Sequence, residues 1–276
     1  MSISQSTIEE NVHIALQEDI GDGDITAELI PEDAIALASV VSREACILCG
    51  MDWFEEVYRQ LGDETLLEWS FTDGDAVAAG AVVCSLSGPA RTLLTGERTA
   101  LNFLQMLSAT ATRASAYAQA VAGTGAVVLD TRKTIPGLRA AQKYAVTCGG
   151  CHNHRMGLFD AILIKENHII ACGGISAAVE QARFRNPGIM VEVEVENLDE
   201  AQQAIDAGAD RLLLDNFDIE HMKQAVALFK GRTELEASGN ITLKNIRDYA
   251  LTGVDYISTG ALTKDIIAID LSMRFS

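Results

Sequence analysis

The chain has 276 residues and a formal net charge of −18, with 39 acidic side chains against 21 basic ones. So acidic a surface argues against nucleic acid as a partner, because binding a phosphate backbone needs a broad basic face. No apolar run reaches the roughly eighteen residues of a membrane span, so we expect no membrane insertion. The acidic N-terminus lacks the features of a secretory leader, which favours a cytoplasmic location where the six cysteines stay reduced.

The first 115 residues alternate helical and extended patterns. We expect helices near 6–19, 51–61 and 90–121, and strands near 35–49 and 66–71. The glycine-containing segment 73–80 predicts the start of a hairpin-like run that extends to Ser87. These elements together predict an α+β domain whose last helix leads into the rest of the chain.

From about Gly123 onward, short apolar runs alternate with helical patterns, which is typical of a parallel sheet covered by helices. The predicted strands are 126–129, 161–164, 190–195, 211–214, 234–237 and 255–258. The predicted helices are 137–147, 174–185, 198–207, 219–230 and 242–251. A βα barrel and an open doubly wound sheet both fit this alternation. The polar residues that end each run favour the barrel, because the carboxyl ends of its strands meet at one functional mouth.

Positive charge is concentrated between residues 130 and 170. This segment contains Arg132, Lys133, Arg139, Lys143, Arg155 and Lys165, together with His152, His154 and His168. Arginine offers a planar donor fork that fits a carboxylate or phosphate, and lysine offers a compact point charge. The segment therefore predicts a pocket in which Arg132, Lys133, Arg155 and Lys165 neutralise a small dicarboxylate or diphosphate.

Two carboxylates, Glu194 and Asp215, end neighbouring predicted strands. Such a pair suits Mg²⁺ held jointly with substrate phosphates, or the hydroxyls of a ribose, although it could instead balance the lysines. Glu192, Glu194 and Glu196 alternate along one strand and therefore face the same way. We expect that direction to be inward.

Small residues follow the last two predicted strands. These loops are Ser238-Gly239-Asn240 and Thr259-Gly260-Ala261. Free backbone N–H groups in the loops after the final strands commonly bind phosphate in βα barrels. We therefore predict a phosphate site there.

The motif Cys148-Gly-Gly-Cys151-His152 matches the attachment pattern of c-type haem, and its first four residues match redox motifs. Haem attachment belongs to exported proteins, and a zinc finger would need a second cysteine pair at suitable spacing. We therefore expect no haem, metal or redox role for this motif.

These residues, in this order, resemble the quinolinate phosphoribosyltransferase family. The matching motifs are EDIGDGDIT at 18–26, GERTALNFLQ at 96–105, DTRKTIPGLR at 130–139, NHRMGLFDAILIKENHI at 153–169, VEVEVE at 191–196, LLLDNF at 212–217, EASGNI at 236–241 and GVDYISTGALT at 253–263. The resemblance implies an α/β fold with an N-terminal α/β sandwich domain, 1–112, and an incomplete, open α/β barrel, 113–267. It further implies that residues 268–276 return to the first domain. Cys151 and His152 stand where glycines commonly precede NHR in the family.

The resemblance implies a pentosyltransferase that joins quinolinate to phosphoribosyl pyrophosphate with Mg²⁺. The products are nicotinate mononucleotide, pyrophosphate and CO₂, in de novo NAD biosynthesis. Carried onto this chain, the expected substrate-binding residues are Arg98, Thr131, Arg132, Lys133, His154, Arg155, Lys165, Glu194, Asp215, Ser238, Gly239, Asn240, Thr259, Gly260 and Ala261. Of these, Lys133, Lys165, Glu194 and Asp215 are expected to act in catalysis, the last two with Mg²⁺.

The resemblance also assigns roles within that set. Arg132, His154, Arg155 and Lys165 would clamp the dicarboxylate, and Lys133 with Lys165 would meet the pyrophosphate. Arg98 would complete the site of a partner subunit in a homodimer.

Three other functions remain open. A transferase for another pyridine acid, such as nicotinate, would leave part of the four-cation clamp unpaired. Lys165 could form a Schiff base, as in barrel aldolases. A non-catalytic anion sensor would bind ligands without turnover.

Overall fold

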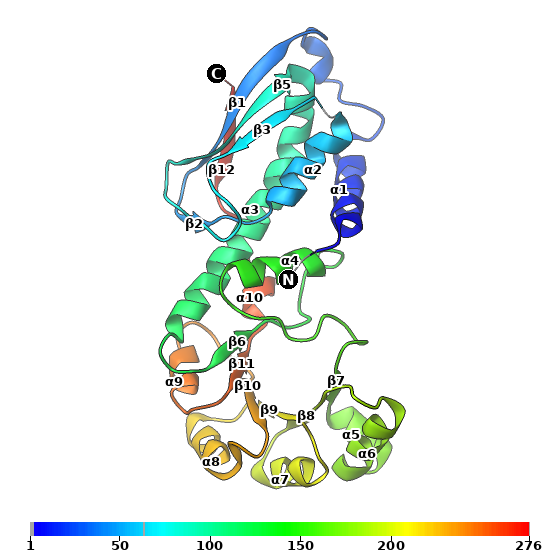
Figure 1. Ribbon diagram of the computed structural model, residues 1–276, viewed down its shortest axis with the longest axis vertical. Coiled ribbons are helices and arrows are strands. Elements are labelled where there is room, and N and C mark those ends of the chain that lie inside the picture. The colour runs from blue at the N-terminus through cyan, green and yellow to red at the C-terminus, as the bar shows by residue number, and fades with distance from the viewer. Residues whose placement is uncertain (1–2, 63, 276) are drawn as a thin grey trace. The chain divides into compact units, whose positions relative to one another are not determined.

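The computed structural model describes residues 3–62 and 64–275, and their contacts divide them into two units (Figure 1). The first unit takes the described residues of 1–115, 135–150 and 265–276, and the second takes 116–134 and 151–264. Within these described ranges, no helix has the length and apolar content needed to cross a membrane.

An antiparallel sheet of four strands, in the order β12-β1-β5-β3, forms the framework of the first unit. Its strands are β1 (Ile35–Ser42), β3 (Leu66–Trp69), β5 (Val82–Pro89) and β12 (Leu271–Phe275). Because β12 pairs with β1, from Ala38 opposite Phe275 to Ser42 opposite Leu271, the end of the chain belongs to this sheet.

The predicted hairpin through 73–87 is wrong. Its first strand, β4 (Ala76–Val77), pairs instead with β2 (Cys46–Ile47) in a separate two-stranded sheet, while β5 pairs with β1 and β3. The turn at 78–81 causes the switch, because Gly80 donates its N–H to the carbonyl of Ser42 and so delivers the chain to the edge of β1.

Helices enclose one core in the first unit. They are α1 (Gln5–Ile20), the short 3₁₀ helix η1 (Ala27–Leu29), α2 (Met51–Leu61), α3 (Ala90–Ala120, assigned to this unit as far as Ser115) and α4 (Arg139–Cys148). Trp53 and Phe54 of α2 are fully buried in this core. Ala141 and Ala145 of α4 pack into it too, so residues 135–150 join this unit, whereas the sequence had placed 113–267 in one domain.

The sheet of the second unit is parallel throughout, in the order β6-β11-β10-β9-β8-β7. Its strands are β6 (Val127–Leu129), β7 (Ile162–Ile164), β8 (Val191–Val195), β9 (Arg211–Asp215), β10 (Glu234–Ser238) and β11 (Tyr256–Ser258). All six predicted strands are confirmed. β6 and β7 form the two edges, and an isolated bridge from Leu129 to His152 lies beyond β6. The sheet is thus the predicted open barrel.

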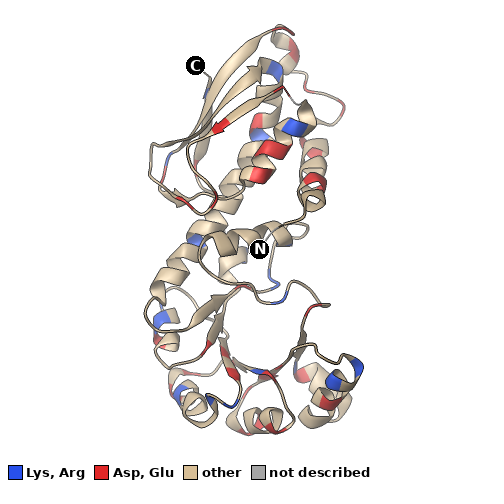
Figure 2. Ribbon diagram, in the orientation of Figure 1, with Lys and Arg blue, Asp and Glu red and all other residues tan. Residues whose placement is uncertain are grey.

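Helices follow the strands of the second unit, and all but the last of them lie outside the curved sheet (Figure 1). They are α5 (Glu166–Cys172), α6 (Ile175–Arg185), α7 (Leu198–Asp206), α8 (Ile219–Phe229), α9 (Ile246–Ala250) and α10 (Ala261–Lys264). Figure 2 shows that both signs of charge lie along the outer helices. In β8, Val191, Val193 and Val195 are buried, and the alternation turns Glu192 and Glu194 to the opposite, inner side of the sheet. This confirms the predicted inward direction for these two glutamates.

Candidate active site

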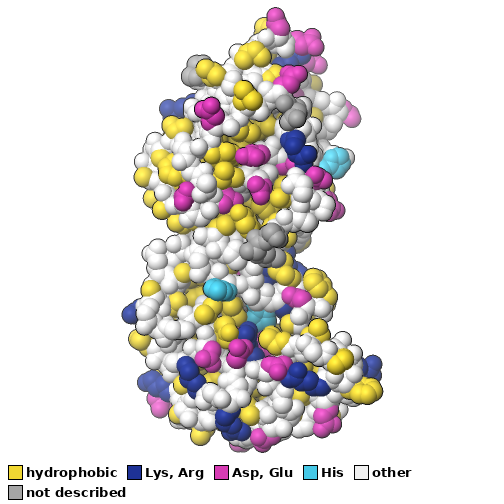
Figure 3. Space-filling model, in the orientation of Figure 1, with side chains coloured by type: hydrophobic (Ala, Val, Ile, Leu, Met, Phe, Trp, Pro, Cys, Tyr) yellow, Lys and Arg dark blue, Asp and Glu magenta, His cyan; other side chains and the backbone are white. Residues whose placement is uncertain are grey.

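A cavity of 350 Å³ lies at the carboxyl ends of the strands of the second unit. Its lining residues are Thr131, Arg132, Lys133, His154, Arg155, Leu163, Lys165, Glu194, Leu213, Glu236, Ser238 and Ser258. Figure 3 shows histidine, acidic and basic side chains close together on one face of this unit. Residues more than a hundred positions apart meet here because parallel strands end at the same edge of the sheet.

The structure brings most of the predicted polar residues into this cavity, but not all. Asp215, Gly239, Asn240, Thr259, Gly260 and Ala261 lie in neighbouring strand-end segments outside the lining. Arg98 lies on α3 of the first unit with an exposed side chain. The lining adds Glu236, Ser258 and two leucines to the residues that the sequence singled out.

The two arginines of the cavity repel each other. Arg155 is partly buried, and its guanidinium donates from Nη1 to the carbonyl oxygen of Ala161 at 3.3 Å. Burial lowers the pKa of Arg155, and the neighbouring charge of Arg132 lowers it further. Two guanidinium groups that line one cavity and repel each other attract an anion into it.

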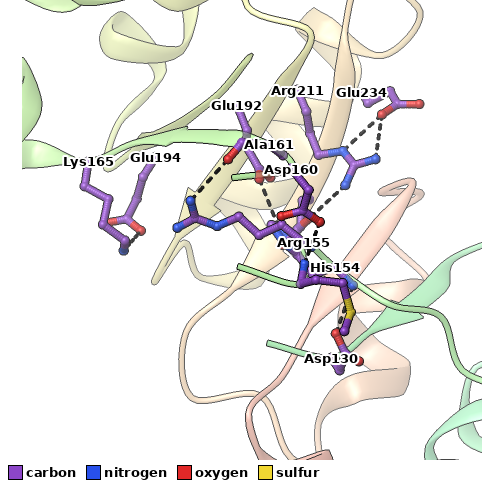
Figure 4. A network of polar contacts seen from close by, with 12 residues as sticks. Asp130, His154, Arg155, Asp160, Ala161, Lys165, Glu192, Glu194, Arg211 and Glu234 are labelled. Carbon is purple, nitrogen blue, oxygen red and sulfur yellow. Dashed lines mark hydrogen bonds and ion pairs between the residues drawn. The ribbon is translucent and has the colours of Figure 1, made fainter. Parts of the chain in front are cut away.

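Lys165 and Glu194 form an ion pair at the rim of the cavity (Figure 4). Burial raises the pKa of Glu194, whereas Lys165 lowers it and the charge of Asp215 raises it again. The carboxylates of Glu194 and Asp215 therefore repel each other electrostatically. Carboxylate oxygens at adjoining strand ends are the hard donors that Mg²⁺ prefers, so this pair fits a shared metal.

His154 is held through both ring nitrogens. Nδ1 accepts a hydrogen bond of 2.8 Å from the backbone N–H of Arg155, and Nε2 lies 2.9 Å from a carboxylate oxygen of Glu192. Its backbone N–H donates to the buried Asp130 at 2.9 Å. Because Nδ1 acts as an acceptor, the proton resides on Nε2 and points toward Glu192 (Figure 4). This arrangement differs from the expectation that the ring donates to a substrate carboxylate.

A buried polar network that was not predicted from the sequence lies beneath the cavity. Glu236 is fully buried, lies 3.5 Å from Nε2 of His154 and accepts from Nη1 of Arg211 at 3.2 Å. Burial and the charge of Glu192 raise the pKa of Glu236 to about 7. Burial likewise raises the pKa of Glu192 to about 6. A signal for Glu236 existed, since it lies two residues before Ser238 and so shares its face of the strand.

A metal is less suited to this buried network than to Glu194 and Asp215. One donor atom each from His154, Glu192 and Glu236 lies within 4.8 Å of the others. Arg211, however, already balances Glu236, and its guanidinium stacks 3.9 Å from the centre of the Tyr256 ring. A cation that is already in place favours an ion network in the protein.

In the loops after β10 and β11, a glycine allows a neighbouring side chain to pack directly against the backbone. Gly239 has φ 99°, and a Cβ at this position would lie 2.3 Å from Oδ1 of Asn216. A Cβ on Gly260 would lie 2.8 Å from the side chain of Lys133. Thr259 fixes the second loop by accepting from the N–H of Ala261 at 3.2 Å. Side chains larger than hydrogen would block both contacts.

The comparisons with known proteins agree with this geometry. The chain matches the model of the quinolinate phosphoribosyl transferase C-terminal domain over residues 110–274 and that of the N-terminal domain over 24–108. The chain belongs to the quinolinate phosphoribosyltransferase family. The predicted resemblance and the predicted α/β fold are therefore confirmed.

Relatives of the quinolinate phosphoribosyltransferase family match nearly the whole chain. The tobacco (Nicotiana tabacum) protein named quinolinate phosphoribosyltransferase [decarboxylating] 1b is 39% identical over 95% of this chain and 81% of its own length. A probable nicotinate-nucleotide pyrophosphorylase [carboxylating] of Bacillus subtilis is 40% identical over 93% of this chain and 89% of its own. Among solved structures, the nicotinate-nucleotide pyrophosphorylase of Francisella tularensis is 48% identical with a TM-score of 0.98, over 100% of this chain and 98% of that one.

A more distant structure shares the fold alone. Human nicotinic acid phosphoribosyltransferase is 12% identical with a TM-score of 0.64, over 100% of this chain and 74% of its own. This similarity therefore does not support the alternative that the pocket takes nicotinate as its substrate.

Proposed function

We propose that the cavity of the second unit binds quinolinate and phosphoribosyl pyrophosphate. There it catalyses phosphoribosyl transfer with decarboxylation, which gives nicotinate mononucleotide, pyrophosphate and CO₂ in de novo NAD biosynthesis. The observation that carries this proposal is that Arg132 and Arg155 line one cavity together with Lys165. Burial lowers the pKa of Arg155 there, and repulsion by the charge of Arg132 lowers it further. Quinolinate carries two adjacent carboxylates and relieves that repulsion, whereas a single carboxylate relieves less of it.

Within this proposal, His154 positions Arg155. The ring accepts from the backbone of Arg155 and faces Glu192, so its two nitrogens hold protein groups. Arg132 and Arg155 then form the dicarboxylate clamp, with Lys165 nearby in the same cavity. Thr131 and Lys133 follow the same strand, β6, and line the cavity beside Arg132. Lys133 and Lys165 are the cations assigned to the pyrophosphate.

We assign Mg²⁺ to Glu194 and Asp215, jointly with the donor substrate. The electrostatic interaction between these carboxylates supports the assignment, because two neighbouring negative charges gain from a divalent cation. The chemistry that the metal supplies when bound is neutralisation of charge on the pyrophosphate oxygens. Lys165 balances part of the charge of Glu194 through their ion pair.

The reaction needs no nucleophilic side chain. As the bond from the ribose C1 to pyrophosphate breaks, positive charge builds on C1, and the pyridine nitrogen of the clamped quinolinate attacks it. Lys133 and Lys165 favour this step by attracting the departing pyrophosphate. The bond between ring C2 and the 2-carboxylate then breaks and CO₂ leaves. The bonding electrons stay on C2, where the positively charged neighbouring nitrogen stabilises them, and C2 takes a proton from water. The clamp contributes by holding the nitrogen against C1.

The loops 238–240 and 259–261 are proposed to hold the 5′-phosphate of the donor. A Cβ at Gly239 or Gly260 would collide with the side chain of Asn216 or Lys133, so the two glycines let these neighbours pack against the loops. The backbone N–H groups of the loops are the donors that we assign to the phosphate. Asn216 and Asn240 have left-handed backbones with φ of 56° and 49°, and Asn240 donates to Asn216 at 3.3 Å. This contact ties the loop after β10 to the end of β9.

We further propose a cytoplasmic homodimer in which Arg98 completes the partner's site. The exposed position of Arg98 on α3 supports this role, because the side chain is accessible to a second molecule. Co-expression of Arg98→Ala and Lys165→Ala chains tests it. If Arg98 acts across subunits, mixed dimers contain one intact site, and about a quarter of wild-type activity returns for random pairing. If Arg98 acts within its own chain, the mixture stays as inactive as the parents.

The overall function is tested by supplying the protein with Mg²⁺, phosphoribosyl pyrophosphate and either quinolinate or nicotinate, and detecting nicotinate mononucleotide by mass spectrometry. We expect product from quinolinate. Product from nicotinate alone would refute the dicarboxylate clamp while keeping the phosphate assignments. The ion pair between Lys165 and Glu194 argues against a Schiff-base enzyme, because an ammonium group in an ion pair is a poor nucleophile. Borohydride trapping of a carbonyl compound on Lys165 would restore it.

A further inference from the structure

Two cysteines from distant parts of the sequence meet in the first unit. Cys49 directly precedes Gly50 at the start of α2, and Cys148 is the last residue of α4. Their thiols are hydrogen-bonded, and both sulfur atoms and a carboxylate oxygen of Asp73 lie within 4.8 Å of one another. The motif at 148–152 thus places its first cysteine beside Cys49, while Cys151 is buried and accepts from the backbone of Ala118 in the second unit.

The two thiols differ in access. Cys49 is fully buried, and its backbone is fixed by Ser108, whose hydroxyl accepts from the N–H of Cys49 at 3.0 Å and donates to its carbonyl at 3.2 Å. Cys148 is partly exposed on the last turn of its helix and is followed by Gly149 and Gly150. A reactant from solvent therefore meets Cys148 first, and Cys148 is the side chain with freedom to turn toward its neighbour.

The surroundings favour the thiolate of Cys148 over that of Cys49. The hydrogen bond from the Cys49 thiol lowers the pKa of Cys148 despite its burial, and Tyr144 contributes a further hydrogen bond. Burial raises the pKa of Cys49. Since the thiolate is the reactive form, the more exposed cysteine is also the more nucleophilic one.

A metal is a weaker interpretation of this cluster, because Asp73 is already committed. One carboxylate oxygen accepts from the N–H groups of Gly50 and Met51, at 3.0 and 3.3 Å, and so caps α2. The other accepts from the hydroxyl of Tyr144 at 3.0 Å. Two thiols remain as donors, whereas structural zinc takes four ligands. Joining the two sulfurs requires no added atom.

We propose that Cys49 and Cys148 form a reversible disulfide when the protein meets hydrogen peroxide. The Cys148 thiolate attacks one peroxide oxygen, the O–O bond breaks, and with one proton the products are a sulfenic acid on Cys148 and water. The Cys49 thiol then attacks the sulfenic sulfur, the S–O bond breaks, and a second water leaves as the S–S bond forms. Two electrons pass from the thiols to the peroxide, and a dithiol returns them. This site is independent of the proposed transferase chemistry.

Peptide mapping of the full-length protein tests the proposal. Peroxide-treated protein is alkylated, unfolded and digested with trypsin, which releases Cys49 in peptide 44–59 and Cys148 in peptide 144–155. Each peptide holds one other cysteine, Cys46 or Cys151, and this supplies matched controls. We expect a link between the two peptides in the wild type, in Cys46→Ala and in Cys151→Ala, and none in Cys49→Ala or Cys148→Ala.

Two further readouts use the wild-type protein, and a third uses the folded Cys49→Ala variant. Oxidised wild-type protein loses about 2 Da as a monomer, one hydrogen from each thiol. Its Tm rises by roughly 5 °C or more, since the bond closes a loop of about a hundred residues. In folded Cys49→Ala, dimedone labels a sulfenic acid on Cys148. A bond inside peptide 144–155, a bond between two molecules, or free thiols at Cys49 and Cys148 after oxidation would overturn the proposal.

Discussion

Glu56 in the first unit and Glu236 in the second are both almost completely buried, but the charges around them differ. Glu56 of the first unit accepts from Nε of Arg59 at 2.7 Å, from Gln60 at 2.6 Å and from Gln5 of α1 at 3.2 Å. Glu236 of the second unit faces the like charge of Glu192, and its pKa rises to about 7. The first carboxylate joins helices through its donors, whereas the second lies against the like charge of Glu192 although Arg211 donates to it.

The difference separates a supporting unit from a reacting one. In the first unit, buried charge is compensated and apolar packing dominates the core. In the second, like charges gather at the strand ends, both as the acids Glu192 and Glu236 and as the cations Arg132 and Arg155. Groups whose pKa values are displaced by burial and by charged neighbours concentrate at functional sites.

The largest effect is expected from the core of the first unit. Phe54→Ala removes a fully buried ring from α2 and should lower the free energy of unfolding by about 3–5 kcal/mol, because a cavity remains. The matched control is Phe184→Ala on α6, where the ring is 88% exposed and little change is expected. Equal effects of the two substitutions in urea unfolding would contradict the assignment of the core.

The second-largest effect is a loss of activity that leaves the stability of the protein unchanged. Lys165→Met should reduce kcat by roughly 10²- to 10³-fold, because it removes a cation that stabilises the departing pyrophosphate. Tm should stay near that of the wild type, since Lys165 is 43% exposed. Lys223→Met, on the exposed face of α8, is the control and should retain full activity. A drop in Tm that matches the loss of activity would make Lys165 a structural residue.

A third effect is a pH dependence that resides in the second unit. Because the pKa of Glu236 rises from 4.5 to about 7 on folding, the folded state binds this proton more tightly. The resulting stability is fully present below pH 4.5 and is lost as the pH rises through 7. Between pH 5 and 8, the wild type should lose about 2–3 kcal/mol relative to Glu236→Gln. If the difference in the free energy of unfolding between the wild type and Glu236→Gln stays constant across this pH range, the pKa of Glu236 is not raised.

The smallest effect is a local one at a helix start. Asn197 caps α7 by accepting from the N–H of Glu200 at 2.9 Å. Asn197→Ala should therefore cost about 1 kcal/mol of stability. Activity should not change, because Asn197 is absent from the cavity lining. A loss of turnover measured under saturating substrate would show that α7 also positions the site.

Sequence patterns predicted the second unit better than the first. The six parallel strands were recognisable because buried parallel strands are continuous apolar runs, and their polar ends marked the cavity. The hairpin at 73–87 failed because pairing partners depend on contacts such as that of Gly80 with Ser42, which no local pattern records. The helix at 139–148 was found, but its burial in the first core depends on tertiary packing of Ala141 and Ala145.

The chemistry was likewise predicted in part. Arg132, Lys133, Arg155 and Lys165 do line one cavity, as their concentration in the sequence indicated. The orientation of the His154 ring could not be predicted from the sequence, because it depends on contacts with Glu192 and with the backbone of Arg155. Arg211 was missed because a charge within a strand gives no sign of its partner. Glu236 was missed although its spacing from Ser238 placed both on one face of the strand.

Calorimetric titration can decide whether Arg132 and Arg155 recognise two carboxylates. Quinolinate and nicotinate, which lacks the 2-carboxylate, are each titrated into the wild type and into Arg155→Ala. We expect the wild type to bind quinolinate at least tenfold more tightly, about 1.4 kcal/mol, and the variant to lose most of that preference. A preference that survives unchanged in Arg155→Ala would contradict this role of the two arginines.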